Sequence, residues 1–202
     1  MNYLKHSSRG FTLTELLVAI SIMVILTTVT LANYPRFGRT LAIERDAQLV
    51  ALALRDAGAR AAGTRISASG EFQSLFGVYF DTTPGNNNKY IIFSDINGDQ
   101  FYTPGIGEEL EFVFLSRGVK VDEICRLVKA TPPPPEDCAI GSLSITFERP
   151  APTIRVLGVG TSGGPPVNFG SGDFEIRLGV DGDTFRREVI IWTTGAISIE
   201  EL

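Results

Sequence analysis

The side chains best suited to chemistry in this sequence are oxygen ligands at alternate positions, namely those of Asp95, Asn97 and Asp99. Carboxylate and amide oxygens at this spacing match the first ligands of an EF-hand-like calcium loop, because Ca²⁺ prefers hard oxygen donors. A backbone carbonyl group and the carboxylate of Glu108 would complete the coordination. The sequence therefore offers a candidate Ca²⁺ site made by Asp95, Asn97, Asp99 and Glu108.

The rest of this loop departs from the calcium pattern. Gln100 stands where the pattern expects glycine, Ile106 stands where it expects a bidentate glutamate, and Glu108 and Glu109 come later. Asp and Asn side chains also bond their own backbone and tolerate left-handed conformations, so Asp-x-Asn-Gly is a common turn. We therefore favour a turn here and keep calcium binding as the alternative.

Residue combinations typical of enzymes are missing from the sequence. The single histidine, His6, lies near the N-terminus, so a Ser-His-Asp or Cys-His arrangement cannot form in the rest of the chain. No segment reads G-x-x-x-x-G-K-[ST]. Acidic pairs such as Asp181 and Asp183 lie on one expected turn and are interpreted as solvated. The sequence indicates a protein that is not an enzyme.

An apolar run at residues 11–32 is the longest hydrophobic segment of the chain. A helix of about 20 apolar residues crosses a hydrocarbon core of about 30 Å, so we expect this segment to be transmembrane. Glu15 lies near its start. A lone acid in a membrane segment is costly, so Glu15 indicates a function and needs a named partner.

A short polar leader at residues 1–10 precedes this run and ends at Gly10. Its charged residues, Lys5 and Arg9, are basic, and basic flanks stay in the cytoplasm. We therefore expect a single-pass protein of the inner (cytoplasmic) membrane whose C-terminal domain is extracytoplasmic.

The residues around this junction resemble the N-terminus of type IV pilins and type II secretion pseudopilins. In that family a basic leader ends in Gly, and Phe and a Thr-Leu-x-Glu-Leu-Leu block then open an apolar helix. The matching residues here are Gly10, Phe11, Thr12, Leu13, Glu15, Leu16 and Leu17.

This resemblance implies a set of roles and partners. A prepilin peptidase would cleave between Gly10 and Phe11, and Phe11 would be N-methylated. Glu15 would pair with the terminal amine of a neighbouring subunit during filament assembly. The implied partners are other pilin or pseudopilin subunits, bound through the N-terminal helix, the prepilin peptidase and an inner-membrane assembly platform.

Three other interpretations of this segment stay open. A secretory signal peptide needs a shorter apolar core and a cleavage site after it, whereas Gly10 lies before the run. A plain signal anchor would leave Glu15 without a role. Glu15 could also snorkel to the membrane interface instead of pairing with an amine.

Net charge and cysteine content limit the classes of partner and ligand that we expect. The formal net charge is -5, and loss of Lys5 and Arg9 with the leader would bring it to about -7, so nothing favours nucleic acid as a partner. Cys125 and Cys138 are the only cysteines. Beyond a membrane span, such a pair favours a disulfide over a metal site.

Residues 33–62 form the second half of the expected long helix. Pro35 and Gly38 predict a bend or local melting at residues 33–38. Apolar residues then recur every three or four positions, which predicts a helix face packed on a sheet, with a coiled-coil seam as the alternative. These residues are Ile43, Ala47, Val50, Leu54, Ala57 and Ala61.

Residues 63–202 read as a globular β domain with two groups of antiparallel strands, which makes the fold class α+β. Residues 109–115 alternate polar with apolar, as a half-buried strand does, and residues 180–184 suit a hairpin turn. Residues 131–135 and 158–172 are expected to be loops. The other expected strands cover residues 76–80, 89–94, 119–124, 142–147, 174–178, 187–192 and 196–199.

This helix followed by two strand groups is similar to the minor pilin and pseudopilin family labelled GspH/FimT. The likeness includes the loop at residues 93–98 and a last hairpin that runs from Arg187 to Gly195. The resemblance implies a structural subunit of a type IV pilus or a type II secretion filament. The alternative is a membrane-tethered binding module for DNA uptake or adhesion that such a filament displays.

Overall fold

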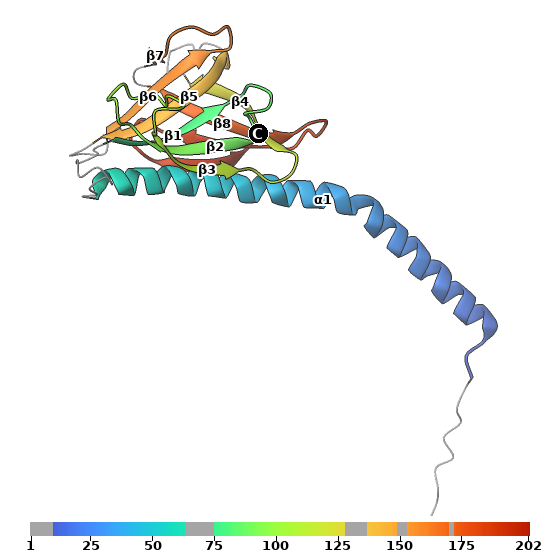
Figure 1. The fold of residues 1–202 in the computed structure, drawn as a ribbon. Coiled ribbons are helices and arrows are strands. Elements are labelled where there is room, and N and C mark those ends of the chain that lie inside the picture. The colour runs from blue at the N-terminus through green and yellow to red at the C-terminus, as the bar shows by residue number, and fades with distance from the viewer. Residues whose placement is uncertain (1–9, 64–74, 128–136, 149–152, 170–171) are drawn as a thin grey trace, which may run out of the picture. The chain divides into compact units, whose positions relative to one another are not determined.

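A computed structural model describes residues 10–63, 75–127, 137–148, 153–169 and 172–202. The chain divides into two units, Met1–Gly38 and Arg39–Leu202, and helix α1 (Leu13–Ala62) contributes to both. In the second unit α1 lies along a β domain (Figure 1). Its strands are β1 (Leu75–Asp81), β2 (Lys89–Ser94), β3 (Glu109–Phe114), β4 (Val119–Leu127), β5 (Ile140–Glu148), β6 (Thr153–Gly160), β7 (Val167–Asn168), β8 (Asp173–Val180), β9 (Arg186–Ile191) and β10 (Ile197–Glu201).

Two antiparallel sheets make up the described β domain, as the α+β prediction requires. The first sheet has the order β3-β2-β1-β5-β6-β7, and the second has the order β10-β9-β8-β4. The predicted grouping along the chain was wrong in two places. Strand β5, expected to begin the second group, pairs with β1 in the first sheet, and β4 pairs with β8 in the second. Strand β6 was not predicted.

One apolar face of α1 forms a continuous core with both sheets. Ile43, Val50 and Leu54 are fully buried there, and so are Ala47 and Ala57. The core side chains of the sheets include Val78 and Leu143 from the first sheet and Ile176 and Val189 from the second. The predicted amphipathic face is confirmed, because its residues are buried in one core cluster with residues of both sheets.

The helix is continuous across Pro35, so the predicted local melting at residues 33–38 was wrong, while the bend stays a prediction. Proline removes one backbone donor from a helix. The turns on either side keep their own hydrogen bonds, and one missing bond does not end a helix of 50 residues.

Asp46 is an unpredicted polar member of the buried helix face. It is almost fully buried, and its carboxylate accepts hydrogen bonds from the backbone N–H of Ser116 at 2.6 Å and from the Ser116 hydroxyl at 2.9 Å. A buried charge is stable when its oxygens are satisfied in this way. Asp46 therefore fixes the loop that follows β3 to the helix.

Strand β3 is an edge strand and is more exposed than predicted. Tyr90 and Ile92, the partners of Val113 and Glu111, face the core, so alternate residues of β3 point away from it. Phe112 is 49% exposed and Phe114 is 66% exposed. The alternation predicted the strand correctly, but Phe112 and Phe114 lie on the outer face of the first sheet, whereas Val113 packs against the core.

The described part of residues 158–172 is more regular than the predicted loop. Residues up to Gly160 belong to β6, and Val167–Asn168 form β7 beside it. A Cβ atom at Gly158 would lie 2.6 Å from the Phe169 ring and 2.8 Å from the Ser142 carbonyl oxygen. Close packing, and not flexibility, is the reason for glycine at this position.

Cys125 and Cys138 form a disulfide, as predicted. It joins β4 to the segment before β5. The loop expected at residues 131–135 and the leader residues 1–9 lie outside the described residues.

We expect Leu54→Ala to lower the free energy of unfolding by about 2–5 kcal/mol, because it empties a fully buried site between α1 and the sheets. Leu52→Ala is the matched control, since Leu52 is 59% exposed on the same helix, and we expect it to change stability by less than about 0.5 kcal/mol. Urea unfolding of the detergent-solubilised chain, followed by circular dichroism, measures both. Equal losses would contradict this packing.

Candidate functional site

The N-terminal site begins with a capping box at the start of α1. The hydroxyl of Thr12 accepts a hydrogen bond from the backbone N–H of Glu15 at 3.3 Å, and the Glu15 carboxylate accepts from the Thr12 N–H at 3.5 Å and the Thr12 hydroxyl at 3.2 Å. This reciprocal pair satisfies N–H groups that the first helical turn leaves free. This role of Thr12 was not predicted, although the spacing Thr-x-x-Glu indicates it.

The apolar residues on both sides of this capping box are exposed in the described chain. Phe11 is 71% exposed and Met23 is 72% exposed, and the helix is long and apolar enough to cross a membrane. Hydroxyls within this run donate to the carbonyl four residues earlier: Ser21 to Leu17, Thr27 to Met23 and Thr28 to Val24. These bonds lower the cost of placing hydroxyl groups in lipid.

Asp95 organises the loop between β2 and β3. It is buried, and its two carboxylate oxygens accept hydrogen bonds from the backbone N–H groups of Gly98 at 2.7 Å and Gln100 at 2.8 Å. Gln100 has a positive φ of 65°. The backbone thus adopts a left-handed conformation at the position where the calcium pattern expects glycine, although the residue is glutamine.

Glu108 closes the same loop from its other end. It is fully buried, and its carboxylate accepts hydrogen bonds from the N–H groups of Ile96 at 3.2 Å and Thr103 at 2.8 Å. Asn97 and Asp99 are exposed and bond to each other, with the Asn97 amide donating to the Asp99 carboxylate at 2.8 Å. The structure therefore brings the four predicted ligands into one loop, and their described bonds are those of a turn.

The last part of this loop covers the outer face of the first sheet. Tyr102 packs against Phe93 and donates to the Glu109 carboxylate at 2.9 Å. Burial, with the bond to Glu109, raises the pKa of Tyr102 well above its ordinary value. A hydrogen bond from the Gly105 N–H, with others including that from Tyr102, lowers the pKa of Glu109. The loop is therefore held by groups that keep their charge states near pH 7.

Among the described residues, one group of three acidic or cysteine ligand atoms lies within 4.8 Å of one another. It consists of Glu123, Cys125 and Cys138. Both sulfur atoms are in the disulfide, so this group is not a metal site. Calcium binding at the Asp95 loop stays a prediction.

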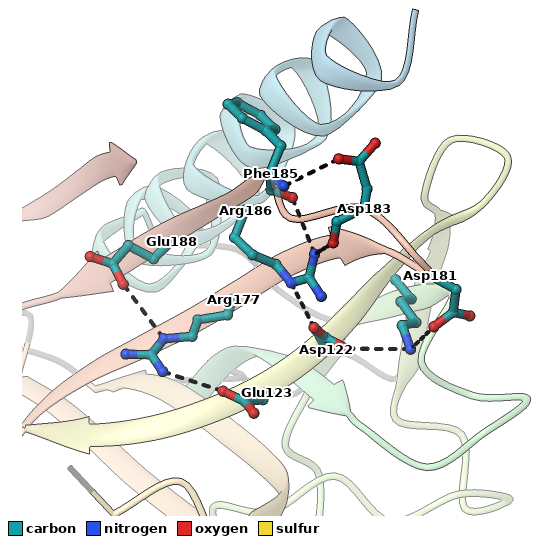
Figure 2. A network of polar contacts seen from close by, with 9 residues as sticks. Asp122, Glu123, Arg177, Asp181, Asp183, Phe185, Arg186 and Glu188 are labelled. Atoms are coloured by element: carbon teal, nitrogen blue, oxygen red, sulfur yellow. Dashed lines mark hydrogen bonds and ion pairs between the residues drawn. The ribbon is translucent and has the colours of Figure 1, made fainter. Parts of the chain in front are cut away.

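A second polar cluster lies on the outer face of the second sheet (Figure 2). Arg186 donates to the Asp122 carboxylate at 2.7 Å and to the Asp183 carbonyl oxygen at 2.6 Å. Lys120 pairs with Asp122 and with Asp181, and the hydrogen bond with Asp181 raises the pKa of Lys120. These bonds hold β4 against the turn between β8 and β9.

Arg177 is the centre of the neighbouring buried part of this cluster. It pairs with Glu123 at 3.3 Å and with Glu188 at 3.6 Å (Figure 2). It also pairs with Glu175 at 2.9 Å, and its guanidinium lies 3.7 Å from the Cys138 sulfur. The ion pairs join β4, β8 and β9 beside the disulfide. These ion pairs stabilise the packing of the three strands, and the cluster contains no activated nucleophile.

The predicted last hairpin is also tied to the helix. Arg187 pairs with Glu44 of α1 at 2.6 Å and with Glu201 of β10 at 3.2 Å. Gly195 turns the chain between β9 and β10 with a φ of 89°. The arginine of this hairpin therefore serves docking of the helix.

We expect millimolar Ca²⁺ to raise the melting temperature of the full chain if the Asp95 loop binds it, because a ligand that binds the folded state alone stabilises that state. Asp99→Asn keeps an oxygen acceptor but removes a charge, so it should lose most of the shift. Asp181→Asn is the control, since Asp181 is 86% exposed on another turn. If the shift in melting temperature is absent, or equal in both variants, calcium binding at this loop is excluded and the turn interpretation remains.

Comparison with known proteins locates the similarity in the N-terminal segment. No curated protein and no solved structure matches the chain significantly. A family described as the prokaryotic N-terminal methylation motif matches residues 5–31. This segment holds Gly10, Phe11 and the capped Glu15, and the match supports a type IV pilin-like or pseudopilin subunit that is processed at its N-terminus.

Proposed function

We propose that this chain is a minor pilin or pseudopilin, a structural subunit of a type IV pilus or of a type II secretion filament. The observation that carries the proposal is the methylation motif at residues 5–31 on a helix whose apolar N-terminal residues are exposed. A helix that is apolar on all sides needs lipid or other helices around it. A filament subunit uses both in turn, first the membrane and then its neighbours.

The methylation motif also implies cleavage and methylation of the N-terminus. A prepilin peptidase cuts between Gly10 and Phe11 and N-methylates Phe11. The subunit stays in the inner membrane through α1, with its β domain extracytoplasmic, until an assembly platform moves it into the filament. The subunit is structural and not catalytic, as the methylation motif suggests.

Glu15 supplies the assembly contact in this proposal. The capping box holds its carboxylate at the N-terminal end of α1, where the amine of a processed neighbour would also lie. A buried amine without its countercharge costs several kcal/mol, so pairing with Glu15 favours a neighbour in the correct register.

The GspH/FimT-like subtype is the finer part of the proposal. Its support is the turn formed by residues 95–99 before β3 and the last hairpin, in which Arg187 ties β9 to α1. The Cys125–Cys138 disulfide suits an extracytoplasmic domain, because disulfides persist in oxidising compartments.

Mass spectrometry of the mature protein from its native envelope tests processing. We expect N-methylated Phe11 as the first residue, and we expect Gly10→Glu to retain the leader because a charge blocks the cleavage site. Cells without the peptidase are the control. An intact Met1 terminus in cells with active peptidase would refute the proposal.

Variants of Glu15 separate its charge from its capping role. Glu15→Gln can still form a capping box but has no charge. We expect Glu15→Gln and Glu15→Leu both to lower recovery in sheared filaments by at least about tenfold, since loss of the countercharge costs more than 1.4 kcal/mol. Thr12→Val removes the cap and keeps the carboxylate, so it should assemble nearly normally.

Membrane extraction and circular dichroism check that each variant is processed, inserted and folded. Normal incorporation of Glu15→Gln together with failure of Thr12→Val would show that Glu15 acts through helix capping. Normal incorporation of both Glu15 variants would remove the assembly contact from the proposal.

A further inference from the structure

The outer face of the first sheet contains a pocket of about 260 Å³. Val78 and Tyr90 point into the core, so their neighbours Tyr79 and Ile91 point to the opposite face. Strand β3, the loop after β2 and the turn after β1 supply the remaining walls. The lining residues are Tyr79, Asp81, Asn86, Lys89, Ile91, Tyr102, Pro104 and Phe112.

Aromatic rings form much of the pocket. The rings of Tyr79 and Tyr102 lie 4.9 Å apart, and Phe112 exposes about half of its surface beside them. Burial raises the pKa of Tyr79 and that of Tyr102, so both phenol groups are neutral near pH 7. Such walls suit a ligand that presents apolar ring faces.

The polar groups of the pocket can both accept and donate hydrogen bonds. Asp81 accepts from the Thr83 N–H at 2.7 Å and from the Tyr79 hydroxyl at 3.5 Å, which leaves lone pairs on each oxygen. The Asn86 side chain makes no hydrogen bond with described residues, and Lys89 forms no ion pair with them, its ammonium lying 5.7 Å from the Phe112 ring centre.

The charges of these groups oppose each other, because Asp81 carries one negative charge and Lys89 one positive charge. A ligand of either net charge would therefore meet repulsion as well as attraction. A hydroxyl group satisfies both kinds of partner, since it donates to a carboxylate and accepts from an amide or an ammonium group. The pocket favours a neutral ligand rich in hydroxyl groups.

An extended peptide fits this surface less well. Peptides that add to a sheet use the free backbone groups of an edge strand. The floor of this pocket is the face of β1 and β2, and each of these strands pairs with neighbours on both sides. Recognition here depends on side chains.

A second groove of about 500 Å³ shares Tyr79 and Asp81 with the pocket. Its lining includes hydroxyl residues and glycines, among them Thr82, Ser142 and Gly160. A ligand longer than one ring could therefore continue from the aromatic pocket across β1 toward β5 and β6.

We propose that this surface binds a neutral oligosaccharide, with sugar rings against Phe112 and Tyr102 and hydroxyl groups on Asp81, Asn86 and Lys89. The site lies in the second unit and does not depend on the filament assignment. It gives the β domain a binding role of its own.

Isothermal titration calorimetry of the full chain tests this proposal. The chain is kept in lauryldimethylamine oxide, because detergents with sugar headgroups would compete for the site. The probes are cellotetraose, maltotetraose and chitotetraose, each compared with its monosaccharide. We expect saturable binding of at least one tetrasaccharide, and tighter binding than that of its monosaccharide because the second groove is also used.

Phe112→Ala should weaken this binding by about tenfold or more, as truncation of an aromatic contact at the centre of a site does. Phe114→Ala is the matched control: it is 66% exposed on the same strand and face but does not line the pocket, so affinity should be unchanged. Thermal unfolding curves verify that both variants fold.

Three results would overturn the proposal. The first is the absence of saturable binding of every tetrasaccharide to the folded chain. The second is an equal loss in Phe112→Ala and Phe114→Ala, which would indicate a nonspecific apolar edge. The third is stronger binding of a charged probe, either a heparin tetrasaccharide or an alternating Lys-Val hexapeptide.

Discussion

The contact on which the rest of the structure depends is the burial of one face of α1 against both sheets. Ile43, Val50 and Leu54 are fully buried on that face, and the core of each sheet closes around them. The same helix begins with apolar residues that are exposed in the described chain. The two halves of this helix therefore have different surroundings. The second half packs on its own domain. In our proposal, the first half is surrounded by lipid before assembly and by neighbouring subunits in the filament.

Acidic residues fix several loops and one helix end in the part of the chain that the structure describes. Glu15 closes a capping box, Asp46 holds the loop after β3, and Asp95 and Glu108 accept backbone N–H groups across their own loop. Each carboxylate has a structural partner in the described chain. The acidic residues that suggested a ligand site in the sequence thus stabilise loops and a helix end. A ligand or a neighbouring subunit that binds these carboxylates has to share or replace their hydrogen bonds.

Short-range sequence patterns predicted the features that depend on neighbouring residues, namely helices, strands and turns. The periodicity of residues 41–62 predicted the buried face of α1, and alternation with turn residues predicted most strands. Sheet membership could not be predicted in this way, because β5 pairs with β1 across a long stretch of sequence. The exposed face of β3 also depends on which side α1 covers. The capping box of Thr12 and Glu15 was visible in the sequence, whereas the aromatic pocket needs residues from separate strands and loops.

Site-specific photocrosslinking at Met23 tests the central claim, that the exposed half of α1 is completed by neighbouring subunits. Met23 is 72% exposed and lies within the methylation motif. A photoreactive amino acid placed there, and illuminated in intact cells that assemble filaments, should give adducts with other pilin-like subunits. Those adducts should disappear in cells without the assembly platform. Adducts with lipid alone, in cells that do assemble filaments, would contradict the account.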